Sequence, residues 1–208
     1  MLPENATPVA YIVRHGQTIL NKDGHFRGNV DPPLDSTGEG QAHELAKLFS
    51  DKPICAIFSS DKQRATKTAD IIAQKDGIPI HLVSALQALN VGNLSGQKRT
   101  KENITLLQHY LDNPDCTIPG GESLNDFRAR VDPCLQHAVH IGVETGVPPI
   151  VVAHSSIIRE VGTLLYKDHK KVLVEPGGAA VIYVQNGKYE AKPIFRPMVE
   201  KKKADTIS

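Results

Sequence analysis

PPIVVAHSS (residues 148–156) is the stretch that decides the fold. An apolar run rich in β-branched residues stops abruptly at an imidazole and two hydroxyls, a pattern typical of a buried strand that opens into a functional loop. PVAYIV (8–13) has the same character and runs directly into Arg14, His15 and Gly16. The sequence therefore predicts two buried strands whose ends carry polar loops.

Working outward from these strands, apolar β-rich runs alternate with stretches of helical period. Helices are expected after Thr37–Gly40, from Asp61 as N-cap to about residue 74, over 101–111, over 122–143 and over 156–166, and further strands over 54–60, 78–83, 179–184 and 188–195. Pro133 predicts a kink in the long helix or a boundary between two helices, and Asn186-Gly187 is the favoured two-residue turn of a hairpin.

Alternation of this kind predicts an α/β fold, a three-layer α/β/α sandwich with a mostly parallel central sheet. We expect one domain over 1–196, with a small irregular or helical cap inserted at about 84–121, and a disordered tail over 197–208.

The composition excludes several classes of protein. A formal net charge of +1 gives no global attraction to nucleic acid, and no apolar run reaches the ~20 residues of a membrane helix. The first residues lack the pattern of a signal peptide, so a cytoplasmic location is expected. Three widely spaced cysteines fit neither a disulfide framework nor a metal cluster.

Cationic and imidazole side chains follow three of the predicted strands. Arg14 and His15 follow the first, Arg64 lies one helical turn past the second, and His154 follows the later one. Ligands of open α/β sheets bind at the carboxyl ends of the strands. Two guanidiniums and two imidazoles meeting there would bind a tetrahedral dianion, and one imidazole nitrogen could attack its phosphorus.

Four motifs resemble, in order, those of the histidine phosphatase superfamily, the phosphoglycerate-mutase-like proteins. They are YIVRHGQT (11–18) with GHFRG (24–28) and DPPLDSTGEGQA (31–42), then FSSDKQRATKTA (58–69), PGGES (119–123) and VVAHSSIIRE (151–160). Together they span residues 8 to about 160. An Arg-His-Gly triplet alone is a weak signal, but four motifs in family order are specific.

The resemblance implies a role for each matching residue. His15 would be the nucleophile that is phosphorylated, Arg14 and Arg64 would hold the phosphoryl oxygens, and His154 would be the second imidazole. Further phosphate or substrate contacts are implied for Asn21, Arg27, Gly28 and Ser155. No metal and no organic cofactor is implied.

One position departs from the family's pattern. The family places a Glu, which protonates the leaving oxygen, in a Leu-x-Glu segment about four residues ahead of a Gly, and in LQALNVGNLSG (86–96) that position is Ala88. General acid catalysis is worth ~10²–10⁴ in rate. Three hypotheses follow: Glu102 or Glu122 replaces the acid, the substrate has a good leaving group and needs none, or the site has become a binding site for a phosphorylated ligand.

The leading prediction is a phosphatase that acts through phosphorylated His15. The alternatives are a phosphoglycerate-mutase-type phosphotransferase and a catalytically weak phospho-ligand binding protein. We expect a small phosphorylated substrate or a phosphoprotein, no nucleic-acid or membrane partner, and a chain compatible with a homodimer. We weigh two roles for His25 and Arg27 about equally: they bind a second anionic group on the substrate, or they are solvated loop residues. Lys98-Arg99-Lys101 is first interpreted as a solvated helix start.

Overall fold

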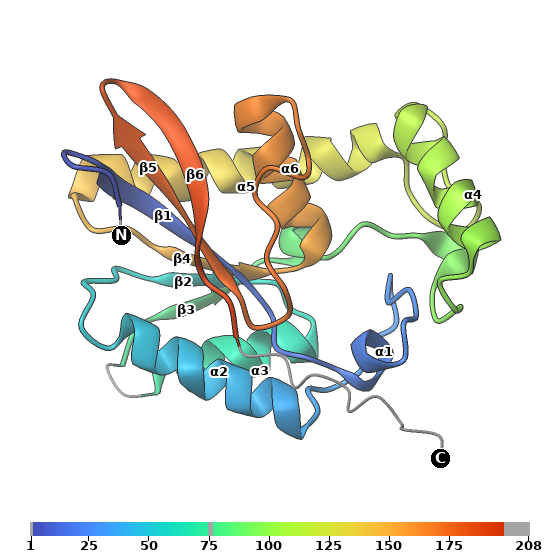
Figure 1. The fold of residues 1–208 in the computed structure, drawn as a ribbon, viewed down its shortest axis with the longest axis horizontal. Coiled ribbons are helices and arrows are strands. Elements are labelled where there is room, and N and C mark those ends of the chain that lie inside the picture. Colours follow the sequence, from blue (N-terminus) through green and yellow to red (C-terminus); the bar gives the residue numbers. More distant parts are fainter. Residues whose placement is uncertain (1, 75–76, 198–208) are drawn as a thin grey trace, which may run out of the picture.

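The computed structural model describes residues 2–74 and 77–197. A six-stranded sheet lies between two layers of helices, with α2 and α3 on one face and α5 and α6 on the other, while α4 lies beyond one end of the sheet (Figure 1). This is the α/β sandwich that the sequence predicts. The strands are β1 Thr7–Arg14, β2 Ile57–Ser59, β3 Ile80–Leu82, β4 Ile150–Ala153, β5 Ala179–Gln185 and β6 Lys188–Phe195. The α-helices are α1 Ile19–Lys22, α2 Ser36–Phe49, α3 Gln63–Ala73, α4 Lys101–Asp112, α5 Leu124–Thr145 and α6 Ser155–Tyr166.

The sheet is mixed, and its parallel half carries the site. The strand order is β3-β2-β4-β1-β5-β6, and the pairs β3-β2, β2-β4 and β4-β1 are parallel whereas β1-β5 and β5-β6 are antiparallel. In the register of the central pair, Arg14 lies opposite Ala153. The loops that begin with His15 and His154 therefore leave the sheet side by side.

Two apolar cores cover the two faces of the sheet. Successive side chains of a strand point to opposite faces, so Ile12 packs into the core under α5 and α6 while its neighbour Val13 packs into the core under α2 and α3. Both are at most 1% exposed. These two cores hold the central strands rigidly, and with them the loops at their ends.

The segment 84–121 forms the irregular cap that was expected, built from two short 3-10 helices (η1 Ser84–Leu86 and η2 Gly92–Leu94) and α4. Its backbone is joined to the loop after β1. Gln97 accepts a hydrogen bond from the amide of Phe26 at 2.9 Å, Gly24 accepts one from Arg99 at 2.9 Å, and His25 forms an isolated antiparallel bridge with Lys98. The cap and the GHFRG segment are thus joined, and together they line one side of the cavity described below.

Three local predictions need correction. α5 is one 22-residue helix that continues through Pro133, so no boundary lies there. α3 begins after Lys62 rather than Asp61, because the carboxylate of Asp61 accepts hydrogen bonds from the Gln87 amide at 2.8 and 3.0 Å. α6 begins one residue earlier than expected, at Ser155, with His154 as its N-cap residue.

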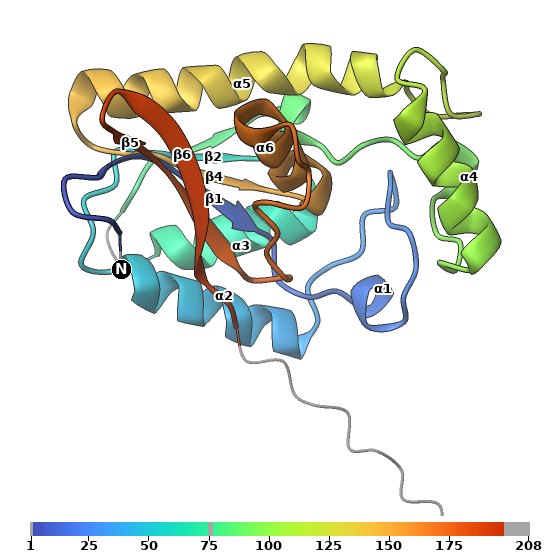
Figure 2. The same ribbon diagram turned by 45° about the horizontal axis from the view of Figure 1, so that its top comes forward.

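The C-terminal hairpin is confirmed. Asn186 and Gly187 have φ of 52° and 74°, the left-handed conformation that a tight two-residue hairpin turn requires. β5 pairs with β1 and β6 pairs with β5, so the hairpin extends the sheet beyond β1 (Figure 2). The tail expected over 197–208 lies, apart from Pro197, outside the described residues. No helix in the described ranges combines the length and apolarity needed to cross a membrane.

Candidate active site

His15 lies at the end of β1 and is completely buried. Its Nδ1 is 2.7 Å from the carbonyl oxygen of Gly16. A carbonyl only accepts, so Nδ1 carries the proton and Nε2 carries the lone pair. Nε2 has no hydrogen-bond partner within the described residues. The ring is therefore held in the tautomer that a nucleophile attacking through Nε2 needs.

The loop that presents His15 is fixed by close backbone packing. A Cβ on Gly16 would lie 2.3 Å from the carbonyl oxygen of Gly38 in the first turn of α2, so only glycine allows this approach. The amide of Gly16 donates to Thr68 Oγ1 at 3.2 Å, and that hydroxyl donates to the carbonyl of Arg64 at 2.7 Å. The carbonyl that orients His15 is thus anchored to both α2 and α3.

Arg64 is fully buried at the start of α3. Its Nη1 donates to the carbonyl of Val30 at 3.0 Å and to Asp31 Oδ1 at 3.2 Å, while Nε and Nη2 have no partner among the described residues. Arg14 is arranged similarly: Nη1 donates to the carbonyl of Val174 at 2.9 Å, and its buried Nε has no partner in the same part of the chain. Each guanidinium is anchored at one nitrogen and keeps buried donors for another group.

His154 lies at the end of β4, across from His15. The two ring centroids are 5.2 Å apart. His154 Nε2 is 2.9 Å from Ser60 Oγ, which follows β2, and its Nδ1 is buried without a partner. The three parallel strands β1, β2 and β4 therefore each contribute a polar residue to one point.

Unsatisfied buried polar atoms concentrate here. Seven such side-chain atoms occur in the described residues, and five belong to the four residues Arg14, His15, Arg64 and His154. Each buried unpaired group costs about 1–3 kcal/mol, so this concentration indicates a site prepared for a ligand. Guanidinium donors of this kind match the oxygens of a phosphoryl group.

Burial and positive charge keep the imidazoles neutral. Desolvation, followed by the charges of His154 and Arg64, lowers the pKa of His15 well below 6.5. Desolvation and then Arg64 lower the pKa of His154 in the same way. Burial also lowers the pKa of Arg14 and of Arg64 to about 10, although Glu175 and Asp31 respectively oppose this. The arginines thus stay charged at neutral pH and the histidines stay neutral.

Two cavities open around this centre. One, of about 430 Å³, runs from His154 and Ser155 along α6 and is also lined by Ala88 and Gly28. The other, of about 350 Å³, is lined by Arg14 and by Asn21. Five residues line both, namely His25, Arg27, Arg99, Ser155 and Arg159.

The predicted substrate residues differ in what holds them. Asn21 Oδ1 accepts hydrogen bonds from the amide and the hydroxyl of Thr18, at 3.1 and 2.9 Å, as part of the N-terminal cap of α1. This oxygen is therefore already engaged in local structure. Gly28 has φ of +46°, and a Cβ there would lie 2.1 Å from Ser95 Oγ. A glycine at this position therefore allows the loop to pack closely against the cap. The Arg27 guanidinium lines both cavities, and burial lowers its pKa to about 9.

The two candidate replacement acids lie elsewhere. Glu122 is held by Arg130, which donates from Nη2 to Oε1 at 2.6 Å and from Nε to Oε2 at 2.9 Å, and Glu122 Oε1 also accepts from the Asn90 amide at 2.8 Å. Glu102 is exposed at the start of α4, where hydrogen bonds from its own amide and from Thr100 lower its pKa. Neither residue lines either cavity.

Sequence reasoning missed several residues of the site. Arg99, interpreted first as part of a solvated helix start, lines both cavities, and its guanidinium lies 5.2 Å from the ring centre of Phe26. Arg159 lies one helical turn after Ser155 on the same face of α6. The i, i+4 spacing could have found Arg159, whereas the position of Arg99 depends on the pairing of cap and loop.

The comparisons with known proteins agree with this geometry. The model of the histidine phosphatase superfamily (branch 1) matches residues 10–174, and the chain belongs to that superfamily. Within it, the chain is 35% identical over 150 residues to a probable phosphoglycerate mutase of Salmonella choleraesuis, covering 69% of this chain and 68% of the relative.

Solved structures show the same fold. A phosphoglycerate mutase from Thermus thermophilus superposes with a TM-score of 0.69 at 29% identity, over 92% of this chain and 99% of its own. An alpha-ribazole phosphatase from Shigella flexneri superposes with a TM-score of 0.70 at 21% identity, over 86% and 92%. The neighbours thus include both phosphatases and mutases.

Proposed function

We propose that the protein hydrolyses phosphate monoesters through a phosphohistidine intermediate on His15. The observation that carries this proposal is the unpartnered Nε2 of His15 beside the unpartnered buried donors of Arg14 and Arg64. In this proposal the neutral imidazole is the nucleophile, and the two charged guanidiniums bind the oxygens of the phosphoryl group that it attacks. Membership of a superfamily that contains phosphatases and mutases supports it.

The chemistry takes two steps. In the first, the lone pair of His15 Nε2 forms a bond to phosphorus as the bond to the ester oxygen breaks, and the leaving group departs as an anion that takes its proton from solvent. In the second, water attacks phosphorus, the P–N bond breaks, and inorganic phosphate leaves as the water gives up a proton. Charge builds on the equatorial oxygens in each transition state, where the arginine donors stabilise it more than the ground state.

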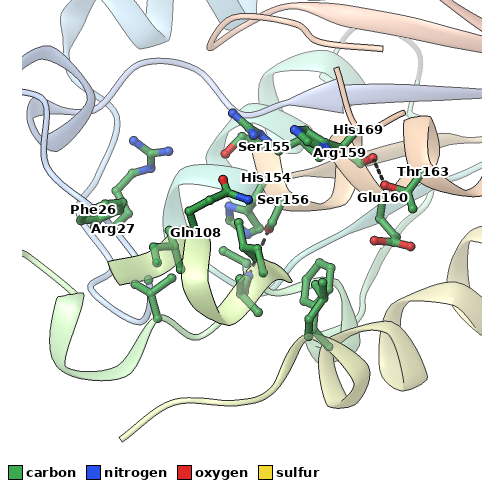
Figure 3. Close-up of a pocket in the computed structure, with 18 of the residues that line it drawn as sticks. Phe26, Arg27, Gln108, His154, Ser155, Ser156, Arg159, Glu160, Thr163 and His169 are labelled. Atoms are coloured by element: carbon green, nitrogen blue, oxygen red, sulfur yellow. Dashed lines mark hydrogen bonds between the residues drawn. The ribbon is translucent and has the colours of Figure 1, made fainter. Parts of the chain in front are cut away.

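The residue at position 88 favours substrates with good leaving groups. Ala88 lines the same cavity as His154, and its side chain supplies no proton. The carboxylates that line the two cavities in the described chain are Asp112, Glu160 and Glu175. Glu175 lies 3.9 Å from Arg14 and is largely exposed, and Glu160 lies at the end of the α6 cavity away from Arg27 (Figure 3). Substrates whose leaving oxygen is stable as an anion, such as aryl phosphates, need no acid.

The test is a series of aryl and alkyl phosphates of graded leaving-group pKa, with His15→Ala as the blank. We expect a steep fall of kcat/KM as the leaving group becomes more basic. A shallow dependence would mean that a protein acid protonates the leaving oxygen. Equal rates for the wild type and His15→Ala on every substrate would overturn the phosphatase and favour a binding protein.

A phosphotransferase of the phosphoglycerate-mutase type is the second candidate, because Arg27, Arg99 and Arg159 gather where the two cavities meet. Burial is the main cause that lowers the pKa of Arg27 and of Arg159, and the charge of Arg99 adds to it in both cases. This cluster fits a substrate with a second anionic group. Turnover of a phosphoglycerate in the presence of a bisphosphorylated primer, without net phosphate release, would identify this activity.

A further inference from the structure

The 430 Å³ cavity extends well beyond the phosphoryl site. It follows one face of α6, on which Ser155, Arg159 and Thr163 succeed one another at four-residue spacing. At a rise of 1.5 Å per residue, Glu160 lies about 9 Å from His154 along the helix axis. Figure 3 shows Glu160 and Thr163 at the end of the pocket away from Arg27. His154 lines this groove, whereas His15 is fully buried and lines neither cavity, so the groove begins on the His154 side of the phosphoryl site.

The wall opposite α6 combines an apolar strip with the polar side chains of Gln108, Asp112 and Arg128. α4 contributes Ile104, Leu107 and Leu111, and α5 contributes Leu124 and Phe127. Ile104 is 44% exposed, and α4 has no fully buried residue, so this surface is open to a ligand. The apolar strip gains from burying hydrocarbon, at roughly 25 cal/mol per Å².

The position of Ala88 extends the apolar lining to the phosphoryl end. Ala88 and Leu89 both line the groove. An alanine here offers no proton to a leaving group and adds a methyl group to a lining that also holds arginine side chains. Both effects favour a leaving group that is hydrophobic and already a stable anion.

The far end of the groove carries a buried carboxylate. Glu160 is 4% exposed, and Arg128 Nε donates to its Oε1 at 3.1 Å. The only side-chain hydrogen bond of Glu160 within the described residues is this one to Oε1, and burial raises the pKa of Glu160, although Arg128 opposes this. A hydrogen-bond donor that reaches this point would find an acceptor ready for it.

We infer that the substrates are phosphate monoesters of an elongated apolar alcohol or phenol, whose distal end carries a hydrogen-bond donor that reaches Glu160. This inference rests on the proposed function for the phosphoryl end alone. The apolar body lies between α4 and α6, and the distal donor binds Oε2 of Glu160. Substrates of the same leaving-group pKa are then selected by the length and polarity of this body.

The test uses arylphosphonates, which bind without turnover, with para-alkyl chains of increasing length. By calorimetry we expect affinity to rise up to about 4-fold for each added CH₂, as expected for burial of ~0.8 kcal/mol per CH₂, until the groove is full. Thr163→Trp, which blocks the groove, and Ile104→Asp should abolish this gain and leave phenylphosphonate binding unchanged. Leu106→Asp is the matched control, because Leu106 is 46% exposed on the same helix but does not line the groove.

A second comparison tests the distal end. A phosphonate that ends in an amino group should bind the wild type more tightly than the methyl-terminated ligand of equal length, and Glu160→Gln should remove most of that difference. Affinity that does not change with chain length would overturn the inference, and an amino group that gains nothing would overturn the role of Glu160. Hydrolysis of phenyl phosphate, measured in parallel, reports on the proposed function by itself, so the two can fail separately.

Discussion

The imidazoles of His15 and His154 face one another with their centroids 5.2 Å apart and their planes at 60°. Each keeps one buried ring nitrogen unpartnered, and each lies among arginines that oppose a further positive charge. This pair therefore remains neutral under conditions in which an ordinary histidine begins to protonate. The nucleophilic attack that we propose for His15 depends on that neutrality.

The first prediction concerns the protonation state of the pair. Both side chains should stay neutral at pH 6.5, the ordinary pKa of histidine, and should take up a proton only well below it. Nitrogen chemical shifts of labelled imidazoles, followed from pH 8 downward and assigned with His15→Gln and His154→Gln, measure this directly. A protonated His15 at pH 6.5 would contradict the site as described.

The second prediction is a dependence of stability on pH. Because the pKa values of both histidines are lowered on folding, the unfolded state takes up protons first as pH falls below 6.5. Stability should be complete above pH 6.5 and decline below it, by up to about 1.4 kcal/mol per pH unit for each histidine. Urea unfolding at pH 7.5, 6.0 and 5.0 measures the decline, and His154→Gln should make it shallower. An equal slope in the variant would show that other groups cause it.

The third prediction separates activity from stability at Arg64. Arg64→Met should lower kcat by roughly 10²–10³, as for the loss of one oxyanion donor, and should abolish stabilisation by orthovanadate. The free energy of unfolding without ligand should change little, because the removal of two unpartnered buried donors offsets the lost bonds to Val30 and Asp31. A stability loss of several kcal/mol would show that Arg64 is mainly structural.

The fourth prediction adds the missing acid. Ala88→Glu should raise the rate on alkyl phosphates by ~10²–10⁴, the usual range for general acid catalysis, and should change aryl phosphates much less. Ala88→Gln is the matched control, since it adds the same volume without a proton to donate. Equal effects of Glu and Gln would show that position 88 does not reach the leaving oxygen.

The fifth prediction assigns Glu122 to structure. Arg130 binds Glu122 and also donates to the carbonyls of Ala85, Gln87 and Ala88, at 2.6, 2.9 and 3.0 Å, so this pair holds the segment that crosses the active site. Glu122→Gln should lower the free energy of unfolding by about 1–3 kcal/mol. It should leave the leaving-group dependence unchanged, as should Glu102→Gln. A steeper dependence in either variant would identify that residue as the acid.

Much of the fold could be predicted from local patterns. The buried strands before His15 and His154 are short apolar runs with abrupt polar ends, and the hairpin at Asn186-Gly187 follows from turn chemistry alone. The start of α3 could not be predicted in this way, because Asp61 accepts a hydrogen bond from the distant Gln87 instead of capping the helix. The continuity of α5 through Pro133 depends on tertiary packing that outweighs the local preference.

The site was predictable where a residue is joined to a strand end. Arg14, His15 and His154 come together because β1 and β4 are parallel neighbours in the sheet. The rest depends on contacts across the chain: the wall formed by Phe26 and Gln97, and the groove between α4 and α6, have no signal in sequence spacing. Glu160 is the last residue of the VVAHSSIIRE motif, but its burial beside Arg128 could not be read from that motif.

The most direct test of the account is to trap the intermediate. The purified protein would be mixed with an aryl phosphate, quenched within milliseconds in alkali, which preserves phosphohistidine, and digested for mass spectrometry. We predict phosphorylation on His15 alone, together with a burst of phenolate equal to the number of active sites if hydrolysis of the intermediate is the slower step. Turnover at full rate in His15→Ala, with no phosphorylated histidine in the wild type, would contradict the account.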